Sequence, residues 1–97
     1  FPDVKLERKI LEARVPEINA SLRNQLVNYV QSIRTLDLKK LPAISETIDW
    51  AKTLILLNAK ELDPQLAKDT LNVLLKYQQD IEIVTKEIPG FISSAAG

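Results

Sequence analysis

The sequence predicts an all-α domain, a small bundle of four or five helices. Only 2 glycines and 5 prolines occur among 97 residues, and both glycines lie toward the C-terminal end. An all-β domain needs a higher density of turn residues. Apolar residues recur instead every three or four positions, which is the spacing of one helix face. The length fits a single domain, since domains typically hold roughly 100 to 200 residues.

The first helix is expected over residues 3–14, because Asp3 can cap its first turn and Pro16 prevents further propagation. Its apolar face holds Leu6, Ile10 and Leu11. The second helix should begin at Asn19 or Ser21, either of which can accept a hydrogen bond from a free N–H group, and end near Leu36. Its face comprises Leu22, Leu26, Tyr29, Val30 and Ile33.

Residues 37–44 lack helical spacing and predict a loop from which Leu38 and Leu41 pack inward. A third helix follows over residues 45–57, with a buried stripe and an asparagine suited to the left-handed conformation after its last turn. The stripe comprises Ile48, Ala51, Leu54 and Ile55, and the asparagine is Asn58.

Asp63 followed by Pro64 marks the start of a fourth helix. Its apolar positions permit one long helix to about Glu87, or a break near Asn72 into two shorter helices. We expect the helical domain to span residues 1–88 and residues 89–97 to form a disordered tail, because the segment after Pro89 and Gly90 is small and polar.

These stripes define a predicted structural core: Leu22, Leu26, Val30, Ile33, Ile48, Trp50, Leu54, Leu71 and Leu74. Trp50 could instead mark a binding surface. A core position is favoured, because Trp50 and Leu54 are one helical turn apart and together widen the buried stripe.

Composition argues against several functions. Lys plus Arg and Asp plus Glu both number 13, whereas nucleic-acid-binding domains usually have a basic excess. The absence of Cys and His removes disulfides, thiol chemistry and the commonest metal ligand, so no metal site is expected. No apolar run is long enough to cross a membrane and no signal peptide is visible, which predicts a cytoplasmic location.

No residue pattern predicts catalysis by this chain. Glu46 and Asp49 could pair as acids, but a solvated first helical turn explains them better. Lys39 and Lys40 could contact phosphate, although two loop lysines more often only increase solubility. The Gly-rich loop that surrounds phosphates in P-loop proteins is missing.

Six blocks of sequence, in this order and spacing, resemble the C-terminal part of MoxR-type AAA+ ATPases, in the CoxD-like branch. The blocks are residues 14–18, 33–40, 45–51, 62–64, 69–71 and 74–77. Phe1-Pro2-Asp3 resembles the point where such proteins pass from the ATPase core into a small helical lid. The resemblance therefore implies a lid domain that responds to nucleotide.

The parent protein would bind ATP and magnesium, form a homo-oligomeric ring, and act like a chaperone that remodels proteins or assists metal or cofactor insertion. The resemblance implies two partners for the lid: the AAA+ core of the same chain and a von Willebrand factor A domain protein. It places Phe1, Pro2, Ile10 and Ser45 near the nucleotide. The family's usual sensor arginine is absent from residues 42–46, where Ser45 lies nearest its position.

Three alternatives remain at the level of sequence. Ile10 can belong to the core, and Ser45 can simply cap the third helix. The whole chain can also be a free-standing helical module that binds another protein, because a neutral amphipathic bundle suits that role equally well.

Overall fold

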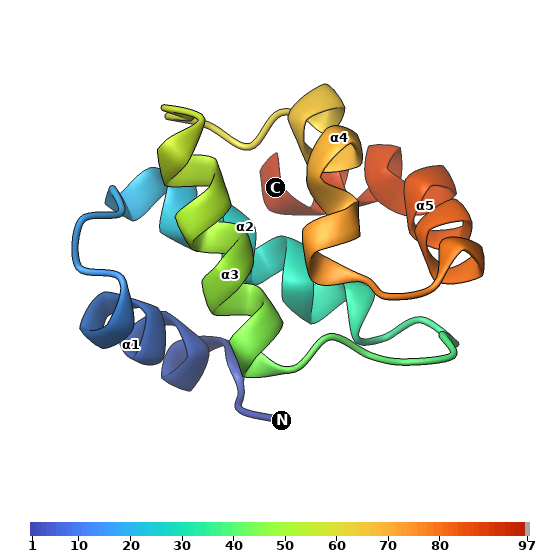
Figure 1. Ribbon diagram of the computed structural model, residues 1–97, viewed down its shortest axis with the longest axis horizontal. Coiled ribbons are helices and arrows are strands. Elements are labelled where there is room, and N and C mark those ends of the chain that lie inside the picture. The colour runs from blue at the N-terminus through green and yellow to red at the C-terminus, as the bar shows by residue number, and fades with distance from the viewer. Residues whose placement is uncertain (97) are drawn as a thin grey trace.

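The all-α prediction is confirmed: five helices and no strand occur within residues 1–96, the part of the chain that the computed structural model describes, with side chains described through Phe91. The helices are α1 (Val4–Arg14), α2 (Ala20–Ile33), α3 (Ile44–Leu56), α4 (Pro64–Leu74) and α5 (Gln78–Ala96). Helix α2 packs against α1, α3 and α5, while α4 packs against α3 and α5 (Figure 1). The Cα radius of gyration of 12.1 Å is close to the value of about 13 Å for a compact domain of 100 residues.

The helix starts follow the capping signals in the sequence. Asp3, Asn19 and Asp63 each accept a hydrogen bond from the backbone N–H three residues later, at 2.8, 2.8 and 2.9 Å. Asn58, after the end of α3, has φ of 57°, the left-handed conformation that asparagine tolerates. These polar side chains therefore set where α1, α2 and α4 begin and where α3 ends.

The core lies between α2 and the surrounding helices, and every residue of the predicted structural core is at most 7% exposed. Trp50 is fully buried, and its indole Nε1–H donates to the Thr70 hydroxyl at 2.7 Å. Its ring packs edge to face on Tyr29, with centroids 6.2 Å apart. The indole therefore joins α3 to both α2 and α4.

One long fourth helix does not form, and the alternative of two helices is correct. The break falls at residues 75–77 rather than near Asn72. Leu75 is extended, with φ of −116° and ψ of 139°, and is 3% exposed. Leu74 and Leu75 are both buried, so the core continues through the end of α4.

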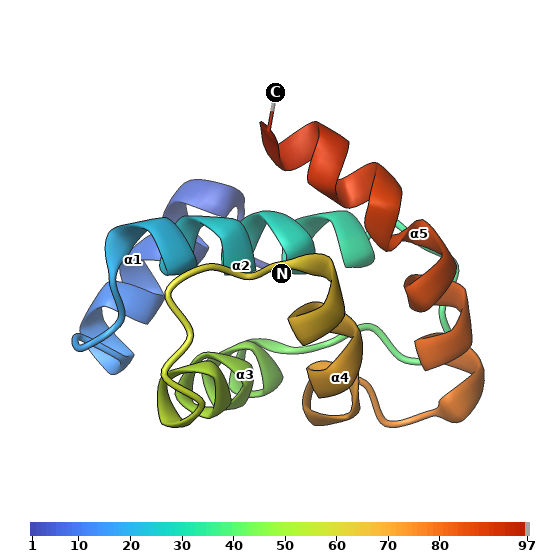
Figure 2. The ribbon, with the colours of Figure 1, turned by 90° about the horizontal axis from the view of Figure 1, so that it is seen from above.

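The expected disordered tail from Pro89 is also corrected, because α5 continues through Pro89 and Gly90 to Ala96. Proline inside a helix typically costs about 3 kcal/mol. Apolar side chains on both sides of Pro89 oppose that cost: Ile88 is fully buried, and the Phe91 ring packs edge to face on Tyr29 at 6.1 Å. Figure 2 shows α5 running from α4 past the end of α2. Gly97 of the expected tail lies outside the described residues.

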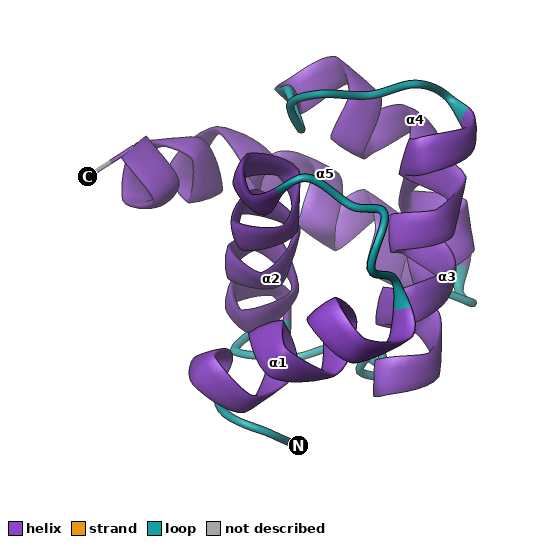
Figure 3. Cartoon of the chain, turned by 90° about the vertical axis from the view of Figure 1, so that its left-hand side faces the viewer, coloured by secondary structure: helices purple, strands orange, loops and turns teal. Residues whose placement is uncertain are grey.

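Helix α1 buries two of the three residues of its predicted face, and Leu6 is the exception. Leu11 is fully buried and Ile10 is partly buried against the core, but Leu6 is 49% exposed. Glu7 takes the inner position and is fully buried. Helix α1 lies against α2 and α3 (Figure 3), so this carboxylate faces the interior of the bundle.

Candidate functional site

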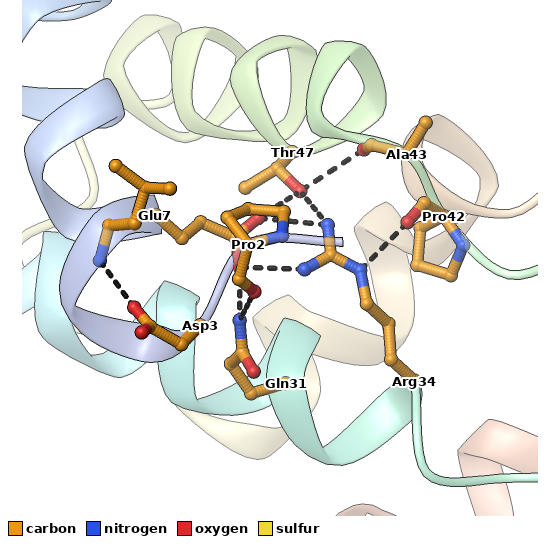
Figure 4. A network of polar contacts seen from close by, with 9 residues as sticks. Pro2, Asp3, Glu7, Gln31, Arg34, Pro42, Ala43 and Thr47 are labelled. Carbon is orange, nitrogen blue, oxygen red and sulfur yellow. Dashed lines mark hydrogen bonds and ion pairs between the residues drawn. The ribbon is translucent and has the colours of Figure 1, made fainter.

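A buried ion pair joins α1 to the end of α2 (Figure 4). Both guanidinium nitrogens Nη1 and Nη2 of Arg34 donate to the two carboxylate oxygens of Glu7, each at 2.8 Å. The Glu7 side chain is 0% exposed and the Arg34 side chain 6%. This two-pronged geometry is the strong form of a carboxylate–arginine contact.

Two further side chains saturate the carboxylate. The Gln31 amide donates to Glu7 Oε1 at 2.7 Å, and the Thr47 hydroxyl donates to Oε2 at 3.1 Å. Gln31 also donates to the Pro2 carbonyl at 3.2 Å. Because a buried charge is tolerated only when it is paired and hydrogen-bonded, this network explains how Glu7 can lie inside the bundle.

Arg34 also joins the N-terminal segment to the turn that enters α3. Its Nε donates to the Pro42 carbonyl at 2.9 Å, and its Nη2 lies 3.3 Å from the Thr47 hydroxyl. The guanidinium carbon lies 4.6 Å from the centre of the Phe1 ring, within the range of a cation–π contact. We call this group, made of Phe1, Pro2, Glu7, Gln31, Arg34, Pro42 and Thr47, the Arg34 junction.

The residues implied by the resemblance have separate surroundings. Phe1, 74% exposed, and Pro2 belong to the Arg34 junction. Ile10 packs against the core, in agreement with its structural alternative. Ser45 is exposed and its hydroxyl donates to Glu46 Oε2 at 2.6 Å. It does not cap α3, whose N-cap is Ala43, without a side-chain capping bond.

A second polar cluster surrounds Glu46 and consists of Ser45, Lys40, Glu46 and Lys76. Lys40 Nζ lies 3.8 Å from Glu46 Oε1. The hydrogen bond from Ser45 is the largest effect that lowers the pKa of Glu46, and Lys40 and Lys76 lower it further. Glu46 is therefore held ionised beside two lysines, and Asp49 is exposed on the same helix.

Neither cluster supplies a metal site within the described part of the chain. Glu7 and Arg34 are occupied by each other and by their neighbours. Among the described residues no group of three or more acidic, His or Cys side chains could hold a metal ion. In the same part of the chain, no helix is both long and apolar enough to span a bilayer.

Sequence reasoning missed Glu7 and Arg34. A signal was present: Glu7 precedes Ile10 and Leu11 by three and four residues, so it shares their helix face. The identity of its cation could not follow from spacing, because Arg34 lies 27 positions away.

Comparisons of the chain with models of protein families, with curated proteins and with solved structures give no match.

Proposed function

We propose that this chain is the nucleotide-responsive helical lid domain of a MoxR-type AAA+ ATPase. The observation that carries the proposal is that the N-terminal segment and the turn entering α3 meet at Arg34. These are two segments that the resemblance places beside the nucleotide.

The Arg34 junction suits the mechanical part of this role. Arg34 ties together Phe1, α1, the end of α2 and the first turn of α3 through a charge pair that water barely reaches. We expect this end of the bundle to move as one rigid unit, because separating the two partners of a buried ion pair is costly. A nucleotide bound against Phe1 and Pro2 would thus move the whole lid.

The proposed parent supplies the chemistry. ATP and magnesium bind in its AAA+ core, and the lid contributes contact and movement rather than a catalytic residue. The parent would form a homo-oligomeric ring in the cytoplasm and remodel partner proteins or assist metal or cofactor insertion, with a von Willebrand factor A domain protein as a partner.

The test uses the complete gene product that contains this chain. Phe1→Ala should raise the KM for ATP by about threefold to tenfold while kcat changes less than about twofold, since losing contact with bound substrate weakens ground state and transition state alike. Leu56→Ala is the matched control, because Leu56 is a large apolar side chain that is 82% exposed on α3. A complete gene product without ATPase activity, or equal KM values for Phe1→Ala and wild type, would refute the proposal.

A second candidate function is a module that binds another protein. It is favoured by Leu56 and Leu57, adjacent residues at the end of α3 that are 82% and 55% exposed. Under this alternative, Leu56→Ser with Leu57→Ser abolishes association with the partner and Phe1→Ala has no effect. The lid proposal predicts instead that Phe1→Ala weakens nucleotide binding and that the double serine variant does not.

A further inference from the structure

Helix α5 has a weak point at Pro89 and Gly90, two exposed residues inside it. Proline has no backbone N–H to donate to the preceding turn, and glycine is the poorest helix former after proline. A Cβ placed on Gly90 would meet no neighbouring atom within 4 Å, so the helix surface is open there. The preceding turns are anchored by Val84 and Ile88, which are fully buried. Residues 89–96, which we call the C-terminal arm, therefore join the bundle through a weakened turn.

Phe91 packs the C-terminal arm onto α2. Its partly buried ring meets the Tyr29 ring edge to face, with the two centroids 6.1 Å apart. Figures 2 and 3 both show the last turns of α5 projecting past α2, away from the other helices. A helical segment this short is marginal in water without packing. The contact between Phe91 and Tyr29 therefore keeps the arm both docked and helical.

The docked arm leaves a polar atom of Tyr29 unsatisfied. Tyr29 is 2% exposed, and no described residue forms a hydrogen bond with its buried hydroxyl. Burial, and then the negative charge of Asp63, raise the pKa of Tyr29, so the phenol keeps its proton at neutral pH. The neighbouring Trp50, by contrast, donates to the Thr70 hydroxyl at 2.7 Å. A buried hydroxyl without a partner has lost its hydrogen bonds to water and gained none, which costs free energy in the docked state.

We propose that the C-terminal arm is a displaceable cover of Tyr29. The arm turns about its weak point between a docked position, with Phe91 on Tyr29, and an undocked position in which the Tyr29 hydroxyl reaches water. Packing of the two rings favours docking, whereas the unpartnered hydroxyl and the weakened turn oppose it. Because these effects act against each other, the two positions lie close in free energy, as a conformational switch requires. Undocking presents the vacated seat of Phe91 on α2, together with a phenol group able to form hydrogen bonds.

Amide hydrogen exchange of the isotope-labelled chain, followed by NMR, measures how often the arm undocks, because the undocked segment loses its helix. In the wild type we expect the amides of residues 92–96 to exchange at least about tenfold faster than those of Val84 and Ile88. They should still exchange more slowly than in an unstructured peptide. An arm without any protection, or one protected as strongly as Val84 and Ile88, would overturn the inference.

The decisive variant is Tyr29→Phe, which keeps the ring contact and removes the unpartnered hydroxyl. It should stabilise the docked arm and slow exchange in residues 92–96 at least about fivefold. The chain has two tyrosines, and the other provides the matched control. Tyr77 is 38% exposed, so Tyr77→Phe should leave exchange of the arm within about twofold of wild type.

Two variants of the arm itself should act in opposite directions. Phe91→Ala removes the ring that docks the arm and should speed exchange at least about tenfold. Gly90→Ala adds a methyl group in open space and strengthens the weak turn, so exchange should slow about fourfold to fivefold.

Acetylation of the tyrosine hydroxyls by N-acetylimidazole, located by mass spectrometry, tests the cover directly. Phe91→Ala should accelerate the modification of Tyr29 at least about tenfold and leave that of Tyr77 unchanged. Equal rates for Tyr29 in the wild type and in Phe91→Ala would show that the arm does not cover it.

The direction of the Tyr29→Phe effect decides the inference. Unchanged or faster exchange in that variant would overturn it, because the hydroxyl would then not oppose docking. These measurements use the chain without nucleotide, so their outcome is independent of the lid function.

Discussion

Replacing Arg34 by Met tests whether the buried ion pair holds the Arg34 junction together. The substitution keeps an unbranched apolar side chain but removes the guanidinium that contacts both oxygens of Glu7 at 2.8 Å. Glu7 stays fully buried in the folded chain, with only the neutral donors Gln31 and Thr47 left to it. The folded state then contains a carboxylate without a cation.

The expected loss follows from that burial. Removing one partner of a buried pair typically costs about 3 to 5 kcal/mol. The free energy of unfolding of a small domain is about 5 to 15 kcal/mol. Arg34→Met should therefore lose a large share of the stability. For a chain of this size, 1 kcal/mol corresponds to about 4 to 8 °C, and the melting temperature should fall by more than about 12 °C.

Unfolding in urea measures the lost free energy of unfolding. Urea is chosen because guanidinium chloride, the other common denaturant, would screen the ion pair. Glu7→Leu combined with Arg34→Met should recover most of the stability, to within about 1 kcal/mol of wild type, because apolar replacement of a whole buried pair is often neutral. In that double variant the Gln31 amide can still donate to the Pro2 carbonyl, and the Thr47 hydroxyl can still donate to the Ala43 carbonyl.

The control is Arg23→Met, which removes the pair between Arg23 and Glu12, where the side chains are 18% and 53% exposed. That exposed pair should contribute less than about 1 kcal/mol. The reasoning is refuted if Arg34→Met loses no more free energy than Arg23→Met, or if the double variant is less stable than Arg34→Met alone.

Three further predictions concern other parts of the fold. Trp50→Ala should cost about 3 to 5 kcal/mol in urea unfolding, because a fully buried ring and its bond to Thr70 are lost; a loss below about 1 kcal/mol would contradict its central place in the core. Ser45→Ala should raise the pKa of Glu46, measured by NMR titration of its side-chain carbonyl carbon, since the bond from Ser45 is the largest cause of its lowering. A lowered carboxyl pKa adds stability above the unfolded pKa that is lost as pH falls through the folded pKa, so the variant should lose less stability on acidification; an unchanged pKa would contradict this. Asp80→Asn should cost about 1.5 to 3 kcal/mol, because it removes a charged acceptor of two backbone amides, and an equal urea midpoint would contradict the anchoring of the loop.

The sequence predicted those features that depend on neighbours along the chain. Asp3, Asn19 and Asp63 act within their own first turns, so their caps are visible in sequence. Pro89 misled the prediction, because what keeps α5 helical there is packing of Phe91 on Tyr29, far away in sequence. Local helix propensity cannot predict such a contact, because it is formed by tertiary packing.

The candidate site was less predictable for the same reason. The resemblance singled out Phe1, Pro2, Ile10 and Ser45. Arg34, which it did not single out, joins Phe1 to the turn before α3, and Gln31 binds the Pro2 carbonyl. Asp80 likewise anchors Lys39 and Lys40 from about forty positions away. Charges of this kind show no periodicity, so their partners emerge only when the helices are placed in space.

If the chain is the proposed lid domain, the Arg34 junction faces the nucleotide in the complete gene product. Hydrogen exchange of that protein, compared with and without ATP and magnesium, tests it most directly. The account predicts that nucleotide slows exchange in residues 1–7 and 42–47 and leaves residues 56–62, at the end of α3, unchanged. Equal exchange in all three segments with and without nucleotide, or slowing confined to residues 56–62, would contradict it.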